Sequence, residues 1–114
     1  MNESVCQFCN LISNLSDERQ KLKIVYETDS VLAFHAIRPF SEVHIIIISK
    51  KHIANILELS ENDKELSFDL LSATKAAAQE IIAQKGACQV AMYLGSFQEV
   101  NHLHYHVGYD SKSN

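Results

Sequence analysis

The stretch His102-Leu103-His104-Tyr105-His106-Val107-Gly108, read as HLHYHVG, holds three of the chain's six histidines at every second position. Side chains on a β-strand alternate between its two faces, so this spacing predicts three imidazoles on one face. Leu103, Tyr105 and Val107 would then point into a core on the other face. A single histidine on a strand is most simply a solvated or hydrogen-bonded polar side chain. Three in strict alternation, opposite an apolar face, favour a functional site.

A row of imidazoles two residues apart supports two kinds of chemistry. Their Cα atoms lie roughly 6.5–7 Å apart along a strand, close enough to share one small ligand. A neutral imidazole can attack phosphorus and form a phosphoramidate, while its neighbours donate hydrogen bonds to the phosphate oxygens. The same row can instead bind a metal ion, and the spacing leaves both possibilities open.

The sequence on either side of this row predicts a sheet. Strands are expected at 23–27, 31–35, 43–49, 89–94 and 103–107, and the β-branched run 43–49 is typical of a central strand covered on both faces. The run 9–13 indicates a short helix. Strands in a run, a helix and then strands again predict an α+β domain with a mainly antiparallel sheet.

One long helix is predicted between Ser60 and Gly86. Ser60 is a favourable N-cap, and Asp63, three residues on, completes a variant of the capping box. Gly86 supplies the C-terminal stop. Between them, apolar residues recur at helical spacing and predict a face packed on the sheet: Leu66, Leu70, Ala73, Ala77 and Ile81.

Length and composition narrow the possible functions. The chain has 114 residues, and we expect a single domain over 1–114. Its formal net charge of −4, with no basic patch laced with aromatic residues, argues against a nucleic-acid partner. Neither a signal peptide nor an apolar run of membrane-spanning length is recognisable, so a cytoplasmic location without membrane association is expected.

Two cysteines near the start, Cys6 and Cys9, form a CxxC pair. In a reducing compartment such a pair is expected as thiols or metal ligands rather than as a structural disulfide. The spacing supplies half of a zinc ligand set, and the alternative is two free thiols.

Taken together in chain order, these motifs resemble the histidine triad (HIT) family, in particular its bacterial CxxC-containing branch of nucleotide hydrolases and transferases. HLHYHVG resembles the pattern His-φ-His-φ-His-φ-φ, where φ is apolar, if Tyr105 and Gly108 are accepted as φ. The resemblance spans nearly the whole chain. The other matching segments are Cys6-Gln7-Phe8-Cys9 (CxFC), Val25-Tyr26-Glu27 with Val31-Leu32-Ala33-Phe34 (VYE…VLAF), Val43-His44-Ile45-Ile46-Ile47-Ile48 (GHxLVIP), Lys50-Lys51-His52-Ile53 (KKHI) and Gln98-Glu99-Val100 (GQEV or GQSV).

The resemblance implies a five-stranded antiparallel sheet with one long and one short helix, usually dimerising through the long helix and an edge strand. It implies cleavage at the α-phosphate of a nucleoside phosphate, phosphoramidate or dinucleoside polyphosphate, without a catalytic metal. His104 would be the nucleophile that carries the nucleotidyl intermediate. His106 would contact the phosphate, and His44 would orient a neighbouring histidine. Gln98 would bind the phosphate, and Glu99 replaces a Ser or Thr near the leaving group.

The resemblance also implies a second site. In family members that keep the CxxC pair, zinc is held by those cysteines, the histidine of the KKHI segment and the first triad histidine. The implied structural zinc ligands here are Cys6, Cys9, His52 and His102.

Several positions depart from the family pattern. Ala36 stands where an aspartate usually holds the ribose hydroxyls, and an alanine cannot make those hydrogen bonds. Phe97 replaces a glycine before Gln98, where its side chain is expected to block backbone approach to a phosphate. After the triad, Gly108-Tyr109-Asp110 lacks the usual arginine. Two readings follow: a nucleotide hydrolase with an altered substrate, or a zinc-stabilised nucleotide-binding or interaction module with weak or lost catalysis.

Overall fold

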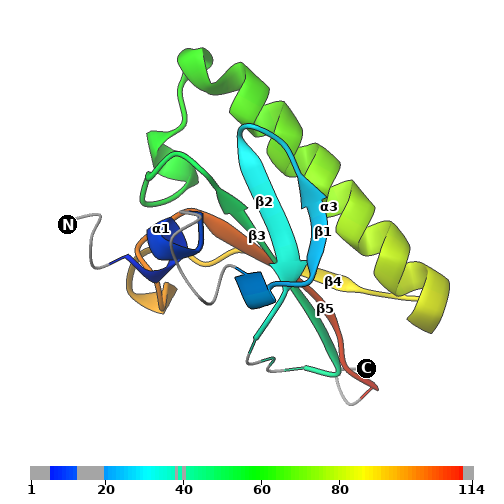
Figure 1. Ribbon diagram of the computed structural model, residues 1–114. Coiled ribbons are helices and arrows are strands. Elements are labelled where there is room, and N and C mark those ends of the chain that lie inside the picture. Colours follow the sequence, from blue (N-terminus) through cyan, green and yellow to red (C-terminus); the bar gives the residue numbers. More distant parts are fainter. Residues whose placement is uncertain (1–5, 13–19, 38, 40, 112–114) are drawn as a thin grey trace.

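The computed structural model describes residues 6–12, 20–37, 39 and 41–111. Its single sheet has the strand order β1-β2-β3-β5-β4, and every neighbouring pair is antiparallel (Figure 1). The strands are β1 (Ile24–Glu27), β2 (Val31–His35), β3 (Val43–Ser49), β4 (Gln89–Ala91) and β5 (His104–Tyr109), and the helices are α1 (Gln7–Ile12) and α3 (Lys64–Lys85). The expected α+β class, with five strands, one long and one short helix, is confirmed.

The long helix α3 begins and ends where its capping residues predict, with one added turn. Ser60 and Asp63 form the capping box, in which the Asp63 carboxylate accepts the Ser60 backbone N–H at 3.0 Å. A 3₁₀ turn, η3 (Glu61–Asp63), precedes the α-helix proper. At the other end Gly86 adopts φ 84°, a left-handed conformation that glycine takes without strain, and donates its N–H to the Ile82 carbonyl at 2.8 Å.

The two helices cover opposite faces of the sheet (Figure 1). The predicted stripe of α3 is buried against one face, on alternating strand residues such as Ala33, Ile45 and Ile47. The residues between them, including Leu32 and Phe34, pack against α1 on the other face. Both faces of β2 and β3 are therefore covered by a helix over much of their length, which explains why the stretch Ile45–Ile48 is apolar without alternation.

Four elements have bounds that differ from those expected: β1 begins at Ile24 instead of residue 23, and β5 also extends two residues further than expected, to Tyr109. The strand predicted over 89–94 ends at Ala91, the last residue of β4 that pairs with β5; a 3₁₀ segment, η4 (Gly95–Phe97), follows, in which Gly95 has φ 66°. The last strand begins at His104 and leaves His102 before it. The short helix begins at Gln7, inside the CxxC segment; of the run 9–13, residue 13 lies outside the described part of the chain.

Gly108 has a steric role inside β5 that its place in the histidine pattern does not reveal. It pairs with His44 on β3, and a Cβ atom built there would lie 2.8 Å from the Val43 carbonyl oxygen and 3.0 Å from the Ser41 hydroxyl. Any larger residue would push β3 and β5 apart at this point. The close approach keeps the two strands that carry His44 and His106 together.

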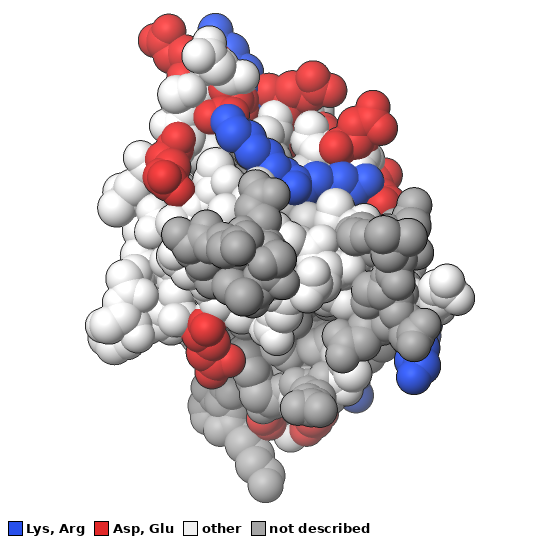
Figure 2. Space-filling model, turned by 60° about the vertical axis from the view of Figure 1, so that its left-hand side comes forward, with Lys and Arg blue, Asp and Glu red and all other residues white. Residues whose placement is uncertain are grey.

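Charged side chains of both signs share the surface that Figure 2 shows. On this face, basic side chains lie beside acidic ones, and the blue side chains do not form an extended basic patch. Within the described ranges, no helix is long and apolar enough to cross a membrane.

Candidate functional site

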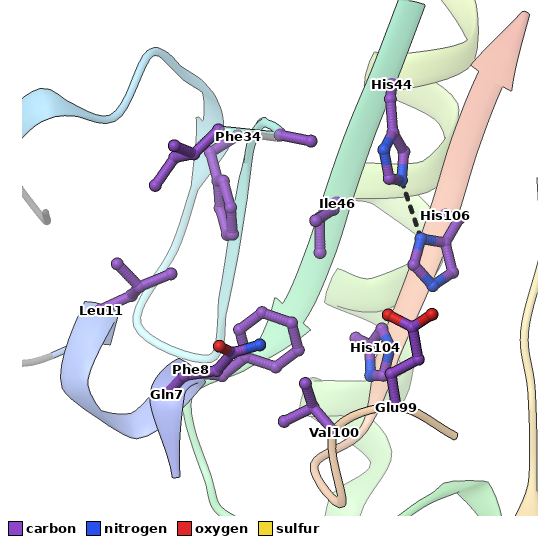
Figure 3. A pocket seen from close by; sticks show the side chains of 12 residues that line it. Gln7, Phe8, Leu11, Phe34, His44, Ile46, Glu99, Val100, His104 and His106 are labelled. Carbon is purple, nitrogen blue, oxygen red and sulfur yellow. Dashed lines mark hydrogen bonds between the residues drawn. The ribbon is translucent and has the colours of Figure 1, made fainter. Parts of the chain in front are cut away.

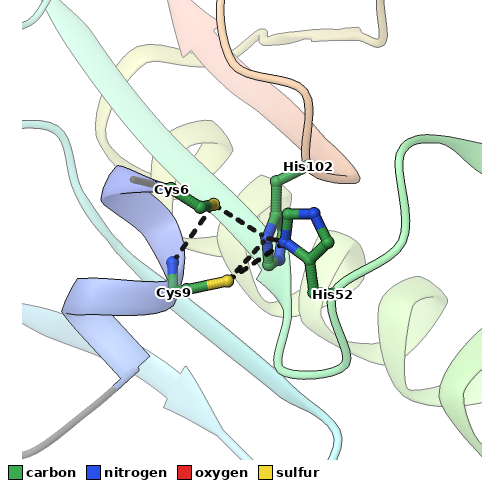
Figure 4. A group of neighbouring side chains, drawn as sticks. All are labelled: Cys6, Cys9, His52 and His102. Atoms are coloured by element: carbon green, nitrogen blue, oxygen red, sulfur yellow. Dashed lines mark hydrogen bonds between the residues drawn. The ribbon is translucent and has the colours of Figure 1, made fainter. Parts of the chain in front are cut away.

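The three triad histidines do not share one environment. His104 and His106 project from β5 toward the face covered by α1, beside His44 of β3 (Figure 3). His102 lies before the strand and turns to a separate group of side chains (Figure 4). The row therefore divides between two groups, which we name for the roles expected of them: a reactive group, His44, His104 and His106, and a metal-binding group that contains His102.

His44 and His106 form a pair across β3 and β5. The register places Ile46 opposite His106 and Gly108 opposite His44, so the two histidines are diagonal neighbours on one face. The His44 Nε2 lies 2.8 Å from the His106 Nδ1, and the two rings are stacked with their centroids 5.0 Å apart. His44 therefore contacts the His106 ring directly, and the orienting role expected of His44 stays a prediction.

His104 is held by the main chain instead. Its Nδ1 lies 2.6 Å from the His102 carbonyl oxygen, and a carbonyl can only accept, so Nδ1 carries the hydrogen. In the neutral ring, Nε2 then has a free lone pair. The side chain is 5% exposed and lines a pocket.

This first pocket has a volume of about 400 Å³, within the range of small-molecule sites. One wall comes from α1 and β2 and is mostly apolar, while the other carries the imidazoles (Figure 3). Ala36 lies in the lining and contributes only a methyl group there. The lining residues are Gln7, Phe8, Leu11, Phe34, Ala36, Ile37, His44, Ile46, Glu99, Val100, His104 and His106.

Burial keeps the reactive histidines neutral near pH 7. Desolvation lowers the pKa of His106 to about 4, and the neighbouring His104 and His44 add to this effect. Desolvation also lowers the pKa values of His104 and His44, against an opposing effect of the Glu99 carboxylate. The hydrogen bond to the His102 carbonyl likewise opposes the shift at His104. A neutral imidazole is the form that can attack an electrophile.

The two residues expected to contact substrate before the triad lie in different places. Glu99 lines the pocket beside the histidines (Figure 3). Gln98 does not line it: its amide donates to the Ala54 carbonyl at 2.8 Å and accepts from Asn55 at 3.2 Å. In this conformation Gln98 connects two loops. Phe97 is also absent from this lining and is 78% exposed.

The metal-binding group gathers four residues from three distant parts of the chain (Figure 4). Their donor atoms, two sulfurs and two imidazole nitrogens, lie within 4.8 Å of one another in Cys6, Cys9, His52 and His102. The His102 Nδ1 is 3.4 Å from the Cys6 sulfur, 3.6 Å from the Cys9 sulfur and 3.1 Å from the His52 Nδ1. Tetrahedral zinc with such ligands has donor-to-donor edges of roughly 3.3–3.8 Å. The four residues fit a metal ion of this size.

The Ser49 carbonyl orients the His102 ring so that its other nitrogen can bind such an ion. No sequence motif pointed to Ser49. The His102 Nε2 lies 2.6 Å from the Ser49 carbonyl oxygen, so Nε2 carries the hydrogen and the Nδ1 lone pair faces the sulfurs. Phe8 is a second residue of the site to which no role was assigned from the sequence, although it lies inside the CxFC motif. Its ring makes edge contacts with His102 at 5.8 Å and His104 at 5.0 Å between centroids.

Comparisons with known proteins agree with this geometry. The family model described as "Scavenger mRNA decapping enzyme C-term binding" matches residues 5–114. The chain is 40% identical over 85 residues to an uncharacterised HIT-like protein of Synechococcus elongatus, covering 74% of this chain and 75% of that protein. It is 30% identical over 105 residues to a bifunctional adenosine 5'-phosphosulfate phosphorylase/adenylylsulfatase of Arabidopsis thaliana, covering 89% of this chain and 67% of that protein.

Solved structures show the same fold. A HIT family hydrolase from Clostridium thermocellum is 31% identical, has a TM-score of 0.78, and the match covers 96% of this chain and 95% of that one. A zinc-bound histidine triad family protein from Mycobacterium smegmatis shares the fold at 22% identity, with a TM-score of 0.79 over 99% of this chain and 80% of that one. The chain belongs to the histidine triad family and has the fold of its hydrolases.

Proposed function

We propose that this protein is a nucleotide hydrolase or nucleotidyl transferase that acts at the α-phosphate of a nucleoside phosphoramidate or dinucleoside polyphosphate. The observation that carries the proposal is the state of His104, whose Nδ1 hydrogen is taken by a carbonyl and whose Nε2 is left for the pocket. The Arabidopsis relative is named for reactions of adenosine 5'-phosphosulfate, which also carries its leaving group on an α-phosphate.

The proposed reaction has two displacements at phosphorus. In the first, the His104 Nε2 lone pair forms a bond to phosphorus, the bond to the leaving group breaks, and the leaving atom keeps its electron pair and takes a proton from solvent water. In the second, water attacks phosphorus, the phosphorus–Nε2 bond breaks with its electron pair returning to the ring, and a proton returns to solvent. A nucleotidyl group on His104 is the intermediate, and no catalytic metal is required.

His44 and His106 would stabilise the charge that develops on the phosphate oxygens. If His44 donates its Nε2 hydrogen to the His106 Nδ1, the neutral His106 ring carries its own hydrogen on Nε2 and offers it to the pocket. A preorganised donor of this kind is most effective in a partly desolvated site.

A second candidate function follows from the residues that depart from the family pattern. Ala36 in the pocket offers no hydrogen bond to a ribose, and Gly108-Tyr109-Asp110 provides no arginine after the triad. These features favour a zinc-stabilised nucleotide-binding or interaction module in which catalysis is weak or lost. Such a module would bind a nucleotide in the first pocket without releasing product.

Incubation with adenosine 5'-phosphoramidate or a dinucleoside tetraphosphate should release AMP, and a rapidly quenched sample should contain an acid-labile nucleotidyl adduct on the peptide that carries His104. His104→Ala should abolish the adduct and lower kcat by at least about a thousandfold. His35→Ala is the matched control, since His35 lies outside both histidine groups and pairs with Glu80 at 3.1 Å. Equal activity of His104→Ala and wild type would exclude the covalent mechanism, and nucleotide binding without turnover would favour the module.

We also propose that Cys6, Cys9, His52 and His102 hold a structural zinc ion, as the donor distances support. When bound, the ion would link α1 to the segment that precedes β5 and supply no chemistry to the reaction. Ligands of this type fit a reducing, cytoplasmic environment, where cysteines stay unpaired.

Finally, we propose a homodimer through α3 and the edge strand β4. Phe68 is 70% exposed, Leu71 65% and Val90 49%, so these elements present apolar side chains to solvent. Phe68→Glu should shift the protein from dimer to monomer in analytical ultracentrifugation. Leu57→Glu should not, because Leu57 is also strongly exposed, at 78%, but lies in η2 (Ile56–Glu58). A monomeric wild type would contradict the proposal.

A further inference from the structure

A second hollow opens beside the reactive histidines. It has a volume of about 500 Å³ and is lined by Tyr93, Phe97, Glu99 and His106. His106 and Glu99 also line the first pocket, so the two hollows meet at the histidines. A substrate with its phosphate at this junction could extend into both.

The far wall of this second hollow is aromatic and open to solvent. The Phe97 side chain is 78% exposed and the Tyr93 side chain 42% exposed. Tyr93 is also held next to the reactive row, with its ring centroid 5.5 Å from that of His106. The 3₁₀ turn η4, which ends at Phe97, presents the other ring. Two aromatic side chains beside a reactive group form a contact surface for an apolar or aromatic group of a ligand.

The charge at the junction selects against one kind of ligand. Glu99 contributes a carboxylate to both hollows, and neither hollow is lined by a lysine or arginine among the residues that the structure describes. A leaving group that carries phosphates would bring negative charge next to this carboxylate, and none of the described lining residues supplies a cationic side chain to offset it. An amine leaving group has an N–H that the carboxylate can accept and gains a positive charge when it is protonated.

We propose that the second hollow is the leaving-group subsite, and that it takes an amine with an aromatic or apolar substituent. This assignment rests on the proposed function and narrows its substrate class to substituted nucleoside phosphoramidates. The phosphorus–nitrogen bond breaks as the His104 Nε2–phosphorus bond forms; the nitrogen keeps the electron pair, takes a proton from solvent water and departs as an amine. Glu99 accepts a hydrogen bond from that nitrogen, while Tyr93 and Phe97 hold the substituent.

The test compares leaving groups on one nucleotide. Adenosine 5'-phosphoramidates of 2-phenylethylamine and of methylamine differ in the apolar group while both leave as alkylamines. Wild type should show kcat/KM about tenfold higher for the phenylethyl substrate, the gain typical of one well-packed apolar group. Phe97→Ala should bring this ratio close to one. The matched control, Leu57→Ala, removes a side chain with the same 78% exposure outside both hollows and should leave the ratio unchanged.

The role of Glu99 is tested with charge. The ratio of kcat/KM for the phenylethyl phosphoramidate over that for diadenosine tetraphosphate should fall about tenfold in Glu99→Gln, because the repulsion of a phosphate leaving group is removed. Glu61→Gln, an exposed acidic residue of η3, should not change it. The protein could release AMP from unsubstituted adenosine phosphoramidate and yet show equal kcat/KM for the phenylethylamine and methylamine substrates. That result, or unchanged ratios in Phe97→Ala and Glu99→Gln, would refute the leaving-group subsite alone. Failure to release AMP from every substrate would overturn the proposed function and the subsite together.

Discussion

The metal-binding group and the reactive histidines share the segment around β5, yet they are assembled in different ways. Cys6, Cys9, His52 and His102 come from three distant parts of the chain and meet only when α1 docks on the sheet. His44, His104 and His106 come from two adjacent strands, β3 and β5, and are aligned by their pairing. The first group depends on the docking of a six-residue helix, whereas the second depends on strand register.

The two groups are nevertheless in contact. The His102 carbonyl accepts the His104 Nδ1 hydrogen, and the Phe8 ring touches both imidazoles. The helix α1 also carries Cys9 and three residues of the pocket wall, Gln7, Phe8 and Leu11, and Cys6 directly precedes it. A metal ion would therefore support one wall of the first pocket without touching the His44–His106 pair.

Loss of the proposed metal ion should have the largest effect on stability, and it tests directly whether the metal-binding group supports the pocket wall. Cys9→Ser should remove zinc and lower the free energy of unfolding by about 3 kcal/mol or more, because the site ties α1 to the sheet. KM for a nucleotide should rise more than kcat falls, since the pocket wall loosens while the histidine pair stays. Zinc content, urea unfolding and steady-state kinetics measure these effects.

The matched control for that prediction is Cys88→Ser, which changes a half-buried cysteine outside the metal-binding group. If both serine variants had the same zinc content and the same unfolding free energy, the structural role of the metal-binding group would be refuted.

A smaller effect is expected from His44→Ala, which changes the reactive group and leaves the metal-binding group intact. His106 would lose the partner that lies 2.8 Å from its Nδ1, and its ring would no longer be oriented toward the phosphate. Loss of such a supporting contact should lower kcat by about ten- to a hundredfold. Zinc content should remain at the wild-type level, and His35→Ala should keep both properties. A fall in zinc content in His44→Ala would show that the two groups are not separable.

The smallest effect concerns stability in acid. The folded-state pKa of His106 is about 4, below its ordinary value of 6.5, so the unfolded chain binds more protons between these values. The contribution of His106 to the unfolding free energy should therefore be complete near pH 7, and the unfolding free energy should fall as the pH drops from about 6.5 toward 4. In His106→Asn this fall should be smaller by about 1 kcal/mol, a figure discounted for solvent screening at a half-buried site.

Urea unfolding of both proteins at several pH values measures this difference. The metal ligands also take up protons in this range, but they are the same in both proteins, so the difference isolates His106. Parallel pH profiles for wild type and His106→Asn would contradict the assignment of a buried neutral imidazole.

Local pattern was sufficient for much of this molecule. The helical stripe of α3, its capping box at Ser60 and its stop at Gly86 all depend on residues close in sequence, and each is confirmed. Alternation along 102–107 correctly placed His104 and His106 on one face. The predicted bounds were wrong where pairing between strands decided them, as in β4, which ends at Ala91, the last of its residues that pairs with β5.

What the sequence by itself determined is which side chains share a face and which elements form, because periodicity and capping act over a few residues. The tertiary structure decided which neighbours each side chain meets. It directs His102 away from the reactive histidines, engages the Gln98 amide with Ala54 and Asn55, and leaves Phe97 exposed beside His106. The contacts of His102 with Cys6 and of Gln98 with Ala54 and Asn55 join residues 43 to 96 positions apart. They depend on strand register and loop paths, for which local periodicity carries no signal.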